Sequence, residues 1–456
     1  MTDETTPVTL RLAQFAAGPG PSTAPTAVRH QAKRCLLDWL GVTLAGSALP
    51  ASRIARETAA VLSPAEQAWV VGSPRRVGAP FAALANGVAA HVLDYDDTYN
   101  PGQTTVHGSA PVWPAVMAAA QLVPTDGRTA LTAFVAGFET AVRVALAAGP
   151  THYDVGWHVT GTVGHIGAAA GASRVLQLDA ASTNAAIGLG ATQAAGMKNV
   201  YGSMGKSLHP GKAAMDGLVS AVLARGGFTS GSTAVEGHRG FLHLFSSDSE
   251  PARAVDRLGE EWVLPDDGFK AYACGSLTHP CIDAVVGLRE QHGLRAEDVA
   301  AVDVAVHDYV LTTTGMREPV TGLEGKFSIY HCVAVALVDG TARLEQFTDD
   351  RVQADDVLAV RDRIRVEHDP TQAKDSASVA LTLVDGRVLR REVAHNKGTP
   401  GNPMTDDELE DKFLDLAGAV LGGPAARRLA DLCWGVDEVP DVTVLMAVAA
   451  GAEAAP

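Results

Sequence analysis

Apolar segments rich in alanine and glycine follow one another up to about residue 265 of this 456-residue chain, and they constrain its fold more than any other feature. In the segment 27–46, apolar side chains recur every three or four residues, which is typical of a helix with one buried face. Similar segments occupy residues 80–93, 112–122, 130–148, 161–176, 181–196 and 211–225. Because small side chains let helices approach closely, the pattern predicts a compact bundle with deeply buried central helices.

Strands are expected only in the C-terminal part of the chain, where β-branched residues alternate with others. The segment 299–311 predicts a strand, and 361–370 predicts one more weakly. Residues 378–393 predict a hairpin, because two alternating runs are joined by Asp385-Gly386, a pair suited to a tight turn.

Helices are expected between these strands, over about 280–293 and 331–340. Thr405, followed three residues later by Glu408, predicts a capping box that starts another helix. We therefore predict a mainly α fold with two domains. The large all-helical domain takes residues 1–267 with 401–456, and a smaller α+β lid domain takes residues 268–400.

The composition is that of a globular protein, with 46% hydrophobic and 19% charged residues. A formal net charge of −16 disfavours binding to nucleic acid or to an anionic membrane surface. The first residues are acidic and polar, unlike a signal peptide, and we expect no apolar run long enough to span a bilayer. Five scattered cysteines without a CxxC pair indicate reduced thiols in a cytoplasmic protein, with no sequence motif for a metal.

Positive charge is concentrated in one stretch, MKNVYGSMGKSLHPGKAAMDG, residues 197–217. It holds a histidine and three of the nine lysines of the chain: His209, Lys198, Lys206 and Lys212. The letters GSMGKS are similar to the end of a phosphate loop, but that motif needs a glycine where this chain has Val200. The next helix is expected to begin near Lys212 and to point its N-terminal amides at the same space. The stretch therefore predicts a site for a small anion.

Three carboxylates lie within four residues in HVLDYDDT, which begins at His91. Asp94, Asp96 and Asp97 repel one another, so this stretch is either the solvated end of a helix or part of a binding site, to which the nearby His107 could belong.

Two further stretches hold histidines. In GWHVTGTVGHIG, His158 is a candidate site residue, whereas His165 lies among apolar residues and is expected to be a hydrogen-bonded core histidine. KAYACGSLTHPCIDA follows the change of domain and contains Lys270, Tyr272 and His279. Since clefts between domains often hold small molecules, these stretches together favour a small-molecule site.

In this order the stretches resemble the MmgE/PrpD family, whose members include 2-methylcitrate dehydratase, cis-aconitate decarboxylase and iminodisuccinate epimerase. The matching fragments are HVLDYDDT, HGSAPVWPA, GWHVTGTVGHIGAAAGASRVLQLD, GSMGKSLHPGKAAMDGLVSAVLARGGFT, VEGHRGFL, KAYACGSLTHPCIDA and KFSIYHCVAVALVDG. The resemblance implies a helical domain, an α+β lid and a homodimer. It also implies reactions on small di- or tricarboxylates without a metal or an organic cofactor.

Carried over to this chain, the family pocket is lined by Asp94, Thr98, His107, His158, Lys206 and His279. The resemblance implies that Lys206 and His209 anchor a carboxylate and that Lys270 closes over the substrate. His107 and His158 are then the leading acid and base, and Asp94 holds one imidazole in its useful tautomer. Asp96 and Asp97 are expected to orient their neighbours.

The chain departs from the family at KFSIYHC. Many relatives carry a tyrosine three residues after this serine, where the chain has His331, with Tyr330 one position earlier. Either Tyr330 takes the role of the tyrosine, or an imidazole that titrates near neutral pH replaces a phenol. The loop between Thr98 and His107 also looks longer than in the decarboxylases.

The sequence therefore predicts a cofactor-independent lyase that removes water, or carbon dioxide, from a small polycarboxylate. An isomerase that takes an α-proton and returns it to the other face would use the same residues. A carboxylate-binding protein without turnover is the third alternative.

Overall fold

The computed structural model of the chain describes residues 6–373 and 375–452. They form two compact units. The first contains the described residues up to Val92, then Asp96–Gly268, then those from Thr405 onward; the second contains Leu93–Tyr95 and Phe269–Met404. Helices dominate, and the described residues form one two-stranded and one four-stranded sheet, which confirms a mainly α fold.

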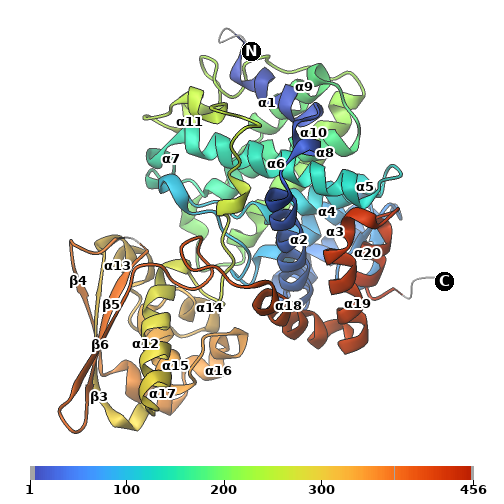
Figure 1. The fold of residues 1–456 in the computed structure, drawn as a ribbon. Helices are drawn as coiled ribbons and strands as arrows, with labels where there is room; N and C mark the ends of the chain where they lie inside the picture. Colours follow the sequence, from blue (N-terminus) through green and yellow to red (C-terminus); the bar gives the residue numbers. More distant parts are fainter. Residues whose placement is uncertain (1–5, 374, 453–456) are drawn as a thin grey trace. The chain divides into compact units, whose positions relative to one another are not determined.

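The first unit is built almost entirely from helices (Figure 1). They are α1 (Val8–Ala17), α2 (Thr26–Ser47), α3 (Pro50–Leu62), α4 (Ala79–His91), α5 (Ser109–Ala120), α6 (Gly127–Ala148), α7 (Pro150–Asp154), α8 (Val159–Val175), α9 (Ala180–Ala191), α10 (Gly205–Arg225), α11 (Phe241–Phe245), α18 (Asp406–Leu421), α19 (Gly423–Trp434) and α20 (Thr443–Ala449).

Close packing of small residues holds the centre of this unit together, as predicted. α8 packs against α6 and α10, and α10 packs against α4. A Cβ atom at Gly217 of α10 would lie 2.4 Å from the Cβ of Ala168 in α8, and one at Gly87 of α4 would lie 2.6 Å from the Cα of Gly211. Larger side chains at these positions would force the helices apart.

The expectation that no apolar run could span a bilayer was wrong for one helix. On length and composition alone α6 is long and apolar enough, but 94% of its apolar window is buried inside the structure. α2 and α3 pass the same test only if this pair, bent by 88°, counts as one span.

A short hairpin interrupts the helices of the first unit and was not predicted. β1 (Ala68–Val70) pairs antiparallel with β2 (Ser73–Val77), and Gly72 in its turn has a φ of 68°. The strands are three and five residues long, so their alternation is too brief to stand out in the sequence.

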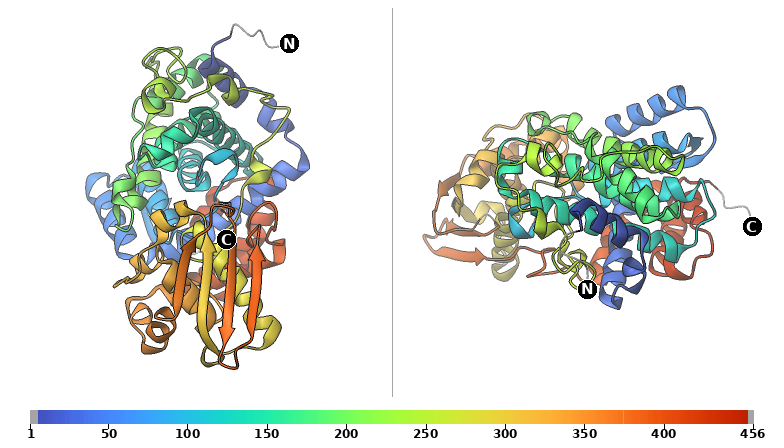
Figure 2. Two further views of the ribbon diagram at one scale, coloured as in Figure 1. Left: turned by 90° about the vertical axis from the view of Figure 1, so that its left-hand side faces the viewer. Right: turned by 90° about the horizontal axis from the view of Figure 1, so that it is seen from above.

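The second unit packs helices on a four-stranded sheet in the order β4-β3-β5-β6 (Figure 2). β3 (Val299–Val306) pairs in parallel with β4 (Ile364–His368) and antiparallel with β5 (Ala377–Leu383), which pairs antiparallel with β6 (Val388–Val393). The helices are α12 (His279–His292), α13 (Asp308–Thr314), α14 (Gly322–Gly325), α15 (Ile329–Val338), α16 (Asp349–Val352) and α17 (Asp355–Arg361).

Most local predictions for this region are confirmed. The hairpin forms with Gly386 at a φ of 88°, and Thr405 and Glu408 make the capping box of α18, the first helix beyond this unit. The strand expected over 299–311 ends earlier, because the side chain of His307 accepts a hydrogen bond from the main-chain N–H of Tyr309 and caps α13.

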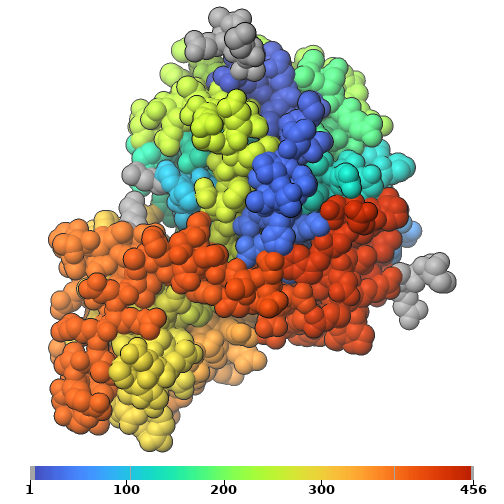
Figure 3. Space-filling model, in the orientation of Figure 1, coloured from blue at the N-terminus to red at the C-terminus, as the bar shows by residue number. Residues whose placement is uncertain are grey.

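A buried ion pair joins α2, in the N-terminal part of the first unit, to α18, in its C-terminal part. Nζ of Lys412 in α18 lies 2.7 Å from Oδ1 of Asp38 in α2, and both side chains are at most 5% exposed. In the space-filling view the N-terminal residues, in blue, lie beside the C-terminal residues, in red (Figure 3). The pair thus fixes α18 against α2.

We expect Lys412→Met to lower the free energy of unfolding by about 3 kcal/mol, because it leaves the carboxylate of Asp38 buried without its counter-charge. Lys33→Met is the matched control. Lys33 also joins α2 to the C-terminal segment, through Asp437, but that pair is partly exposed and should contribute only about 0–1 kcal/mol. Urea denaturation at pH 7 measures both variants, and equal losses would contradict the prediction.

Candidate active site

Four histidines and one lysine lie at or next to the ends of four helices in the first unit. α4 ends at His91, α5 begins two residues after His107, and α8 begins immediately after His158. Lys206 and His209 lie in the first two turns of α10. Residues far apart in the sequence are therefore held close together by rigid elements.

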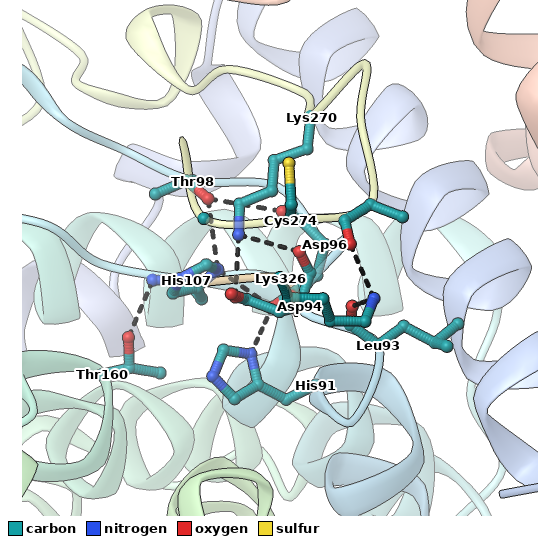
Figure 4. A network of polar contacts seen from close by, with 12 residues as sticks. His91, Leu93, Asp94, Asp96, Thr98, His107, Thr160, Lys270, Cys274 and Lys326 are labelled. Atoms are coloured by element: carbon teal, nitrogen blue, oxygen red, sulfur yellow. Dashed lines mark hydrogen bonds and ion pairs between the residues drawn. The ribbon is translucent and has the colours of Figure 1, made fainter. Parts of the chain in front are cut away.

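Asp96 lies between two imidazoles. Its Oδ2 is 2.8 Å from Nδ1 of His91 and 3.1 Å from Nδ1 of His107 (Figure 4). Because a carboxylate only accepts hydrogen bonds, both rings donate through Nδ1–H. Oγ1 of Thr98 lies 3.2 Å from the same nitrogen of His107, and the main-chain N–H of His107 donates to Oγ1 of Thr160 at 3.0 Å. Nε2 of His107 is therefore the nitrogen able to exchange a proton with a substrate.

Asp96 carries its negative charge at neutral pH. Burial opposes that charge, but His107 and His91 outweigh burial and hold the pKa of Asp96 well below its ordinary value. Burial lowers the pKa of His91 to about 3 in spite of the opposing effect of Asp96, so His91 is neutral. The charge of Asp96 is thus available to stabilise a proton on His107.

His158 and His209 form a second pair. Their Nδ1 atoms are 2.8 Å apart, so one ring must donate the proton and the other must accept it. The ring of His158 also stacks on His91, with 5.5 Å between centroids, and meets the edge of Tyr201. If His158 donates this hydrogen bond, its Nε2 is the basic nitrogen; if it accepts, its Nε2 carries the proton.

Both members of this pair are neutral. Burial, with the neighbouring histidines and Lys206, lowers the pKa of His158 well below 6.5. Burial, with Lys206, lowers the pKa of His209 to about 4. An anion bound beside these rings would raise both pKa values toward neutrality, because an opposite charge favours the protonated form.

Lys206 is the lysine of its stretch whose charge acts on these histidines. It is buried, and its Nζ lies 5.4 Å from the ring centroid of Tyr201. Lys212 pairs with Asp216, and Lys198 donates to the carbonyl oxygen of Tyr153. α10 begins at Gly205 and not near Lys212 as expected, so Lys206 lies in its first turn, where the helix dipole also favours an anion.

The alternative that the three carboxylates form a solvated helix end was wrong, since Asp94, Asp96 and Asp97 are all buried. The side chain of Asp97 accepts a hydrogen bond from the hydroxyl of Ser109, and its main-chain N–H donates to Oδ2 of Asp38 at 3.0 Å. Burial and Asp38 raise the pKa of Asp97 to about 7. Asp97 thus anchors the loop that presents Asp96.

The second unit holds the other predicted residues. Asp94 accepts from Nζ of Lys270 at 2.8 Å. His279 begins α12, and its Nε2 lies 3.3 Å from the carbonyl oxygen of Cys274. The rings of Tyr272 and His279 meet edge to face, with centroids 5.2 Å apart.

The two candidates for the role of the family tyrosine differ in their surroundings. His331 is fully buried, and its Nε2 donates to the carbonyl oxygen of Gln346 at 2.7 Å. Tyr330 is half-buried, and the guanidinium of Arg317 lies 5.2 Å from its ring centroid. The roles of both residues, and those of His279 and Lys270, stay predictions.

The sequence did not single out His91 or Lys326 as site residues. His91 was visible in HVLDYDDT, but only the structure shows that its ring lies between Asp96 and His158. Lys326 begins the fragment KFSIYHC and is buried in the second unit. His165 is confirmed as a core histidine that binds Asp216 and the carbonyl oxygen of Gly161.

Among the residues that the structure describes, two groups of buried side chains bring metal-ligand atoms within 4.8 Å of one another: His91, Asp96 and His107, and Cys35, Asp97 and Asp267. In the first group the carboxylate oxygen already accepts from both imidazoles, so an ion would have to replace two hydrogen bonds. In the second, the thiol of Cys35 lies 3.5 Å from Oδ2 of Asp267. Catalysis without a metal or cofactor stays a prediction.

Two family models match this chain. The MmgE/PrpD N-terminal domain matches residues 10–254, and the MmgE/PrpD C-terminal domain matches residues 272–436. The chain belongs to the MmgE/PrpD family, as its motifs indicated.

Among its relatives, the chain is 29% identical to the cis-aconitate decarboxylase-like protein oryM of Aspergillus oryzae, over 97% of each chain. It is 26% identical to a cis-aconitate decarboxylase of Aspergillus terreus, over 96% of this chain and 95% of the relative. It is 25% identical to the human cis-aconitate decarboxylase, over 93% of this chain and 90% of the relative.

Proposed function

We propose that this protein is a lyase that acts on a small di- or tricarboxylate, with loss of carbon dioxide or of water. The observation that carries the proposal is that two histidines of the site lie in different electrostatic environments. His107 is backed by the charge of Asp96, whereas His158 is neutral and hydrogen-bonded to His209. Two titratable groups set apart in this way suit a general acid and a general base.

Loss of carbon dioxide leaves the electron pair of the broken C–C bond on carbon. We propose that Nε2–H of His107 gives this carbon its proton, that Asp96 stabilises the imidazolium before the transfer, and that solvent replaces the proton afterwards. In a dehydration, His158 would take the α-proton and His107 would protonate the departing hydroxide. Lys206 would hold a substrate carboxylate, because its charge already faces these rings and needs no reorganisation.

The relatives support loss of carbon dioxide as the first reaction to test, since three of them are decarboxylases or a decarboxylase-like protein by name. The isomerase remains the second candidate, because a base on one ring and an acid on another could return the proton to the opposite face. A carboxylate-binding protein is the third. The homodimer and the cytoplasmic location stay predictions from the sequence.

Proton NMR of the protein in deuterium oxide with cis-aconitate, citrate, methylcitrate, malate and aspartate-derived imino acids tests the proposal. We expect new vinyl signals from one of these acids. Bicarbonate release would accompany them in a decarboxylation, and an unchanged number of carbons would indicate a dehydration. Deuterium at an α-carbon of an unchanged skeleton would establish the isomerase instead. Saturable binding without any turnover would favour the carboxylate-binding alternative.

A further inference from the structure

Lys326 is a buried cation of the second unit to which no role has been given above. It lies between α14 and α15 and is 6% exposed. A lysine is rarely buried unless its ammonium is hydrogen-bonded, because burial of a charge is costly. We therefore ask which groups its ammonium binds.

Nζ of Lys326 donates to two main-chain carbonyls from distant parts of the sequence. One is the carbonyl of Leu93, at 2.6 Å (Figure 4), and the other is the carbonyl of Ala273, also at 2.6 Å. Leu93 directly precedes Asp94, and Ala273 lies in the stretch that carries Lys270 and His279. Lys326 thus joins two segments that the sequence singled out for substrate binding.

Two other side chains connect the same segments. Nζ of Lys270 donates to the carbonyl oxygen of Asp94 at 3.0 Å and to its Oδ1 at 2.8 Å. The hydroxyl of Tyr95 donates to the carbonyl oxygen of Ala271 at 3.1 Å. Residues 93–95 and 270–273 are therefore held together by donors from both segments and from Lys326, which belongs to neither.

The turn that Lys326 contacts has an unfavourable backbone conformation. Asp94 has a φ of 53°, in the left-handed region that non-glycine residues rarely adopt. Such a conformation persists only where the surrounding contacts impose it. The hydrogen bond to Leu93, immediately before Asp94, is one of these contacts.

We propose that Lys326 is a positioning residue that fixes the turn at Asp94 against the segment 270–274. It acts through main-chain carbonyls, so it can set the positions of Asp94 and Lys270 without contacting a substrate. Only the kinetic part of this inference rests on the proposed function, because the hydrogen bonds exist whatever the reaction.

The charge of Lys326 is maintained at pH 7. Burial lowers its pKa to about 8, against the opposing effect of Asp94. Lys270 lowers the pKa further, whereas Cys274 and Cys332 raise it. At pH 7 the ammonium is still the major form, so experiments at that pH compare a cation with its neutral replacement.

Hydrogen exchange followed by mass spectrometry tests the inference on the full chain at pH 7. In Lys326→Met we expect amides in peptides covering 92–98 and 270–276 to exchange at least about tenfold faster, while β3 and β5 keep their protection. Arg351→Met is the matched control. It removes another cation of the second unit, one paired with Asp339 and Asp356, and should leave both peptides unchanged.

If Lys326→Met does not fold, Lys326→Gln replaces it, because the amide keeps donors while the charge is lost; the same two peptides should then exchange faster, by a smaller factor. Unchanged exchange in both peptides of a folded variant would overturn the inference.

With a substrate identified by NMR, the kcat of the Lys326 variant should fall about 100-fold while its KM changes less than about threefold, since displaced groups affect the transition state most. If protection falls but kcat does not, Lys326 fixes the turn at Asp94 but has no part in the reaction.

Discussion

Asp96→Asn is expected to lower kcat about 1,000-fold, the range that a positioned acid or base contributes. Asparagine has nearly the same shape, but it is neutral and can donate as well as accept hydrogen bonds. Its amide could therefore impose the wrong tautomer on His107 or His91, and no negative charge would remain to stabilise an imidazolium. Steady-state kinetics with the substrate found by NMR measures the loss.

Asp216→Asn is the matched control, because Asp216 binds His165 at 3.1 Å in the same unit and has no proposed part in the reaction. It should change kcat less than about threefold, although it too replaces a buried carboxylate beside a histidine. Equal losses of kcat in the two variants would contradict the assignment of Asp96.

The pH dependence of the unfolding free energy tests whether the charge of Asp96 stabilises the fold. Because the folded pKa of Asp96 is depressed, its ionised form stabilises the fold above its unfolded value of 3.8, and this stabilisation is lost as pH falls toward the folded pKa. The difference in unfolding free energy between wild type and Asp96→Asn should therefore shrink below pH 3.8. A difference that stays constant to low pH would mean that the charge of Asp96 does not stabilise the fold.

Local features of the fold were predictable because local chemistry determines them. The Asp385-Gly386 turn, the capping box at Thr405 and the alternation in β5 each depend on neighbouring residues, and each is present in the structure. The start of α10 was expected near Lys212 but lies at Gly205, so Pro210 falls in its second turn and is tolerated there.

The polar contacts of the site could not be predicted in the same way. The sequence placed three carboxylates within four residues, but it could not show that Asp96 faces two imidazoles or that Lys270 pairs with Asp94. These partners are contributed by different elements, so only the packing of the helices decides them. The family resemblance named most of the residues, yet it gave no reason to select His91 or Lys326.

Where the reaction removes an α-proton, as in the dehydration or the isomerisation, His158→Gln is expected to lower kcat at least about 1,000-fold while the fold stays intact. Glutamine is similar in size and can still hydrogen-bond to His209, so the buried contact is kept while the titratable nitrogen is lost. His165→Gln is the matched control, because His165 is equally buried in α8 and serves the core. Circular dichroism and urea denaturation should show similar folds for both variants, whereas kinetics should separate them.

The pH profile of kcat/KM gives this variant a second test. In the free wild-type protein, burial and the charge of Lys206 keep His158 neutral, so it can accept a proton across the neutral range and loses that ability only as pH falls well below 6.5. If His158 is the base, any residual activity of His158→Gln should lack this acidic limb. Full activity, or an unchanged acidic limb at reduced rate, would remove His158 from the proton transfer and leave His209 as the next ring to test, because the two share one proton between their Nδ1 atoms.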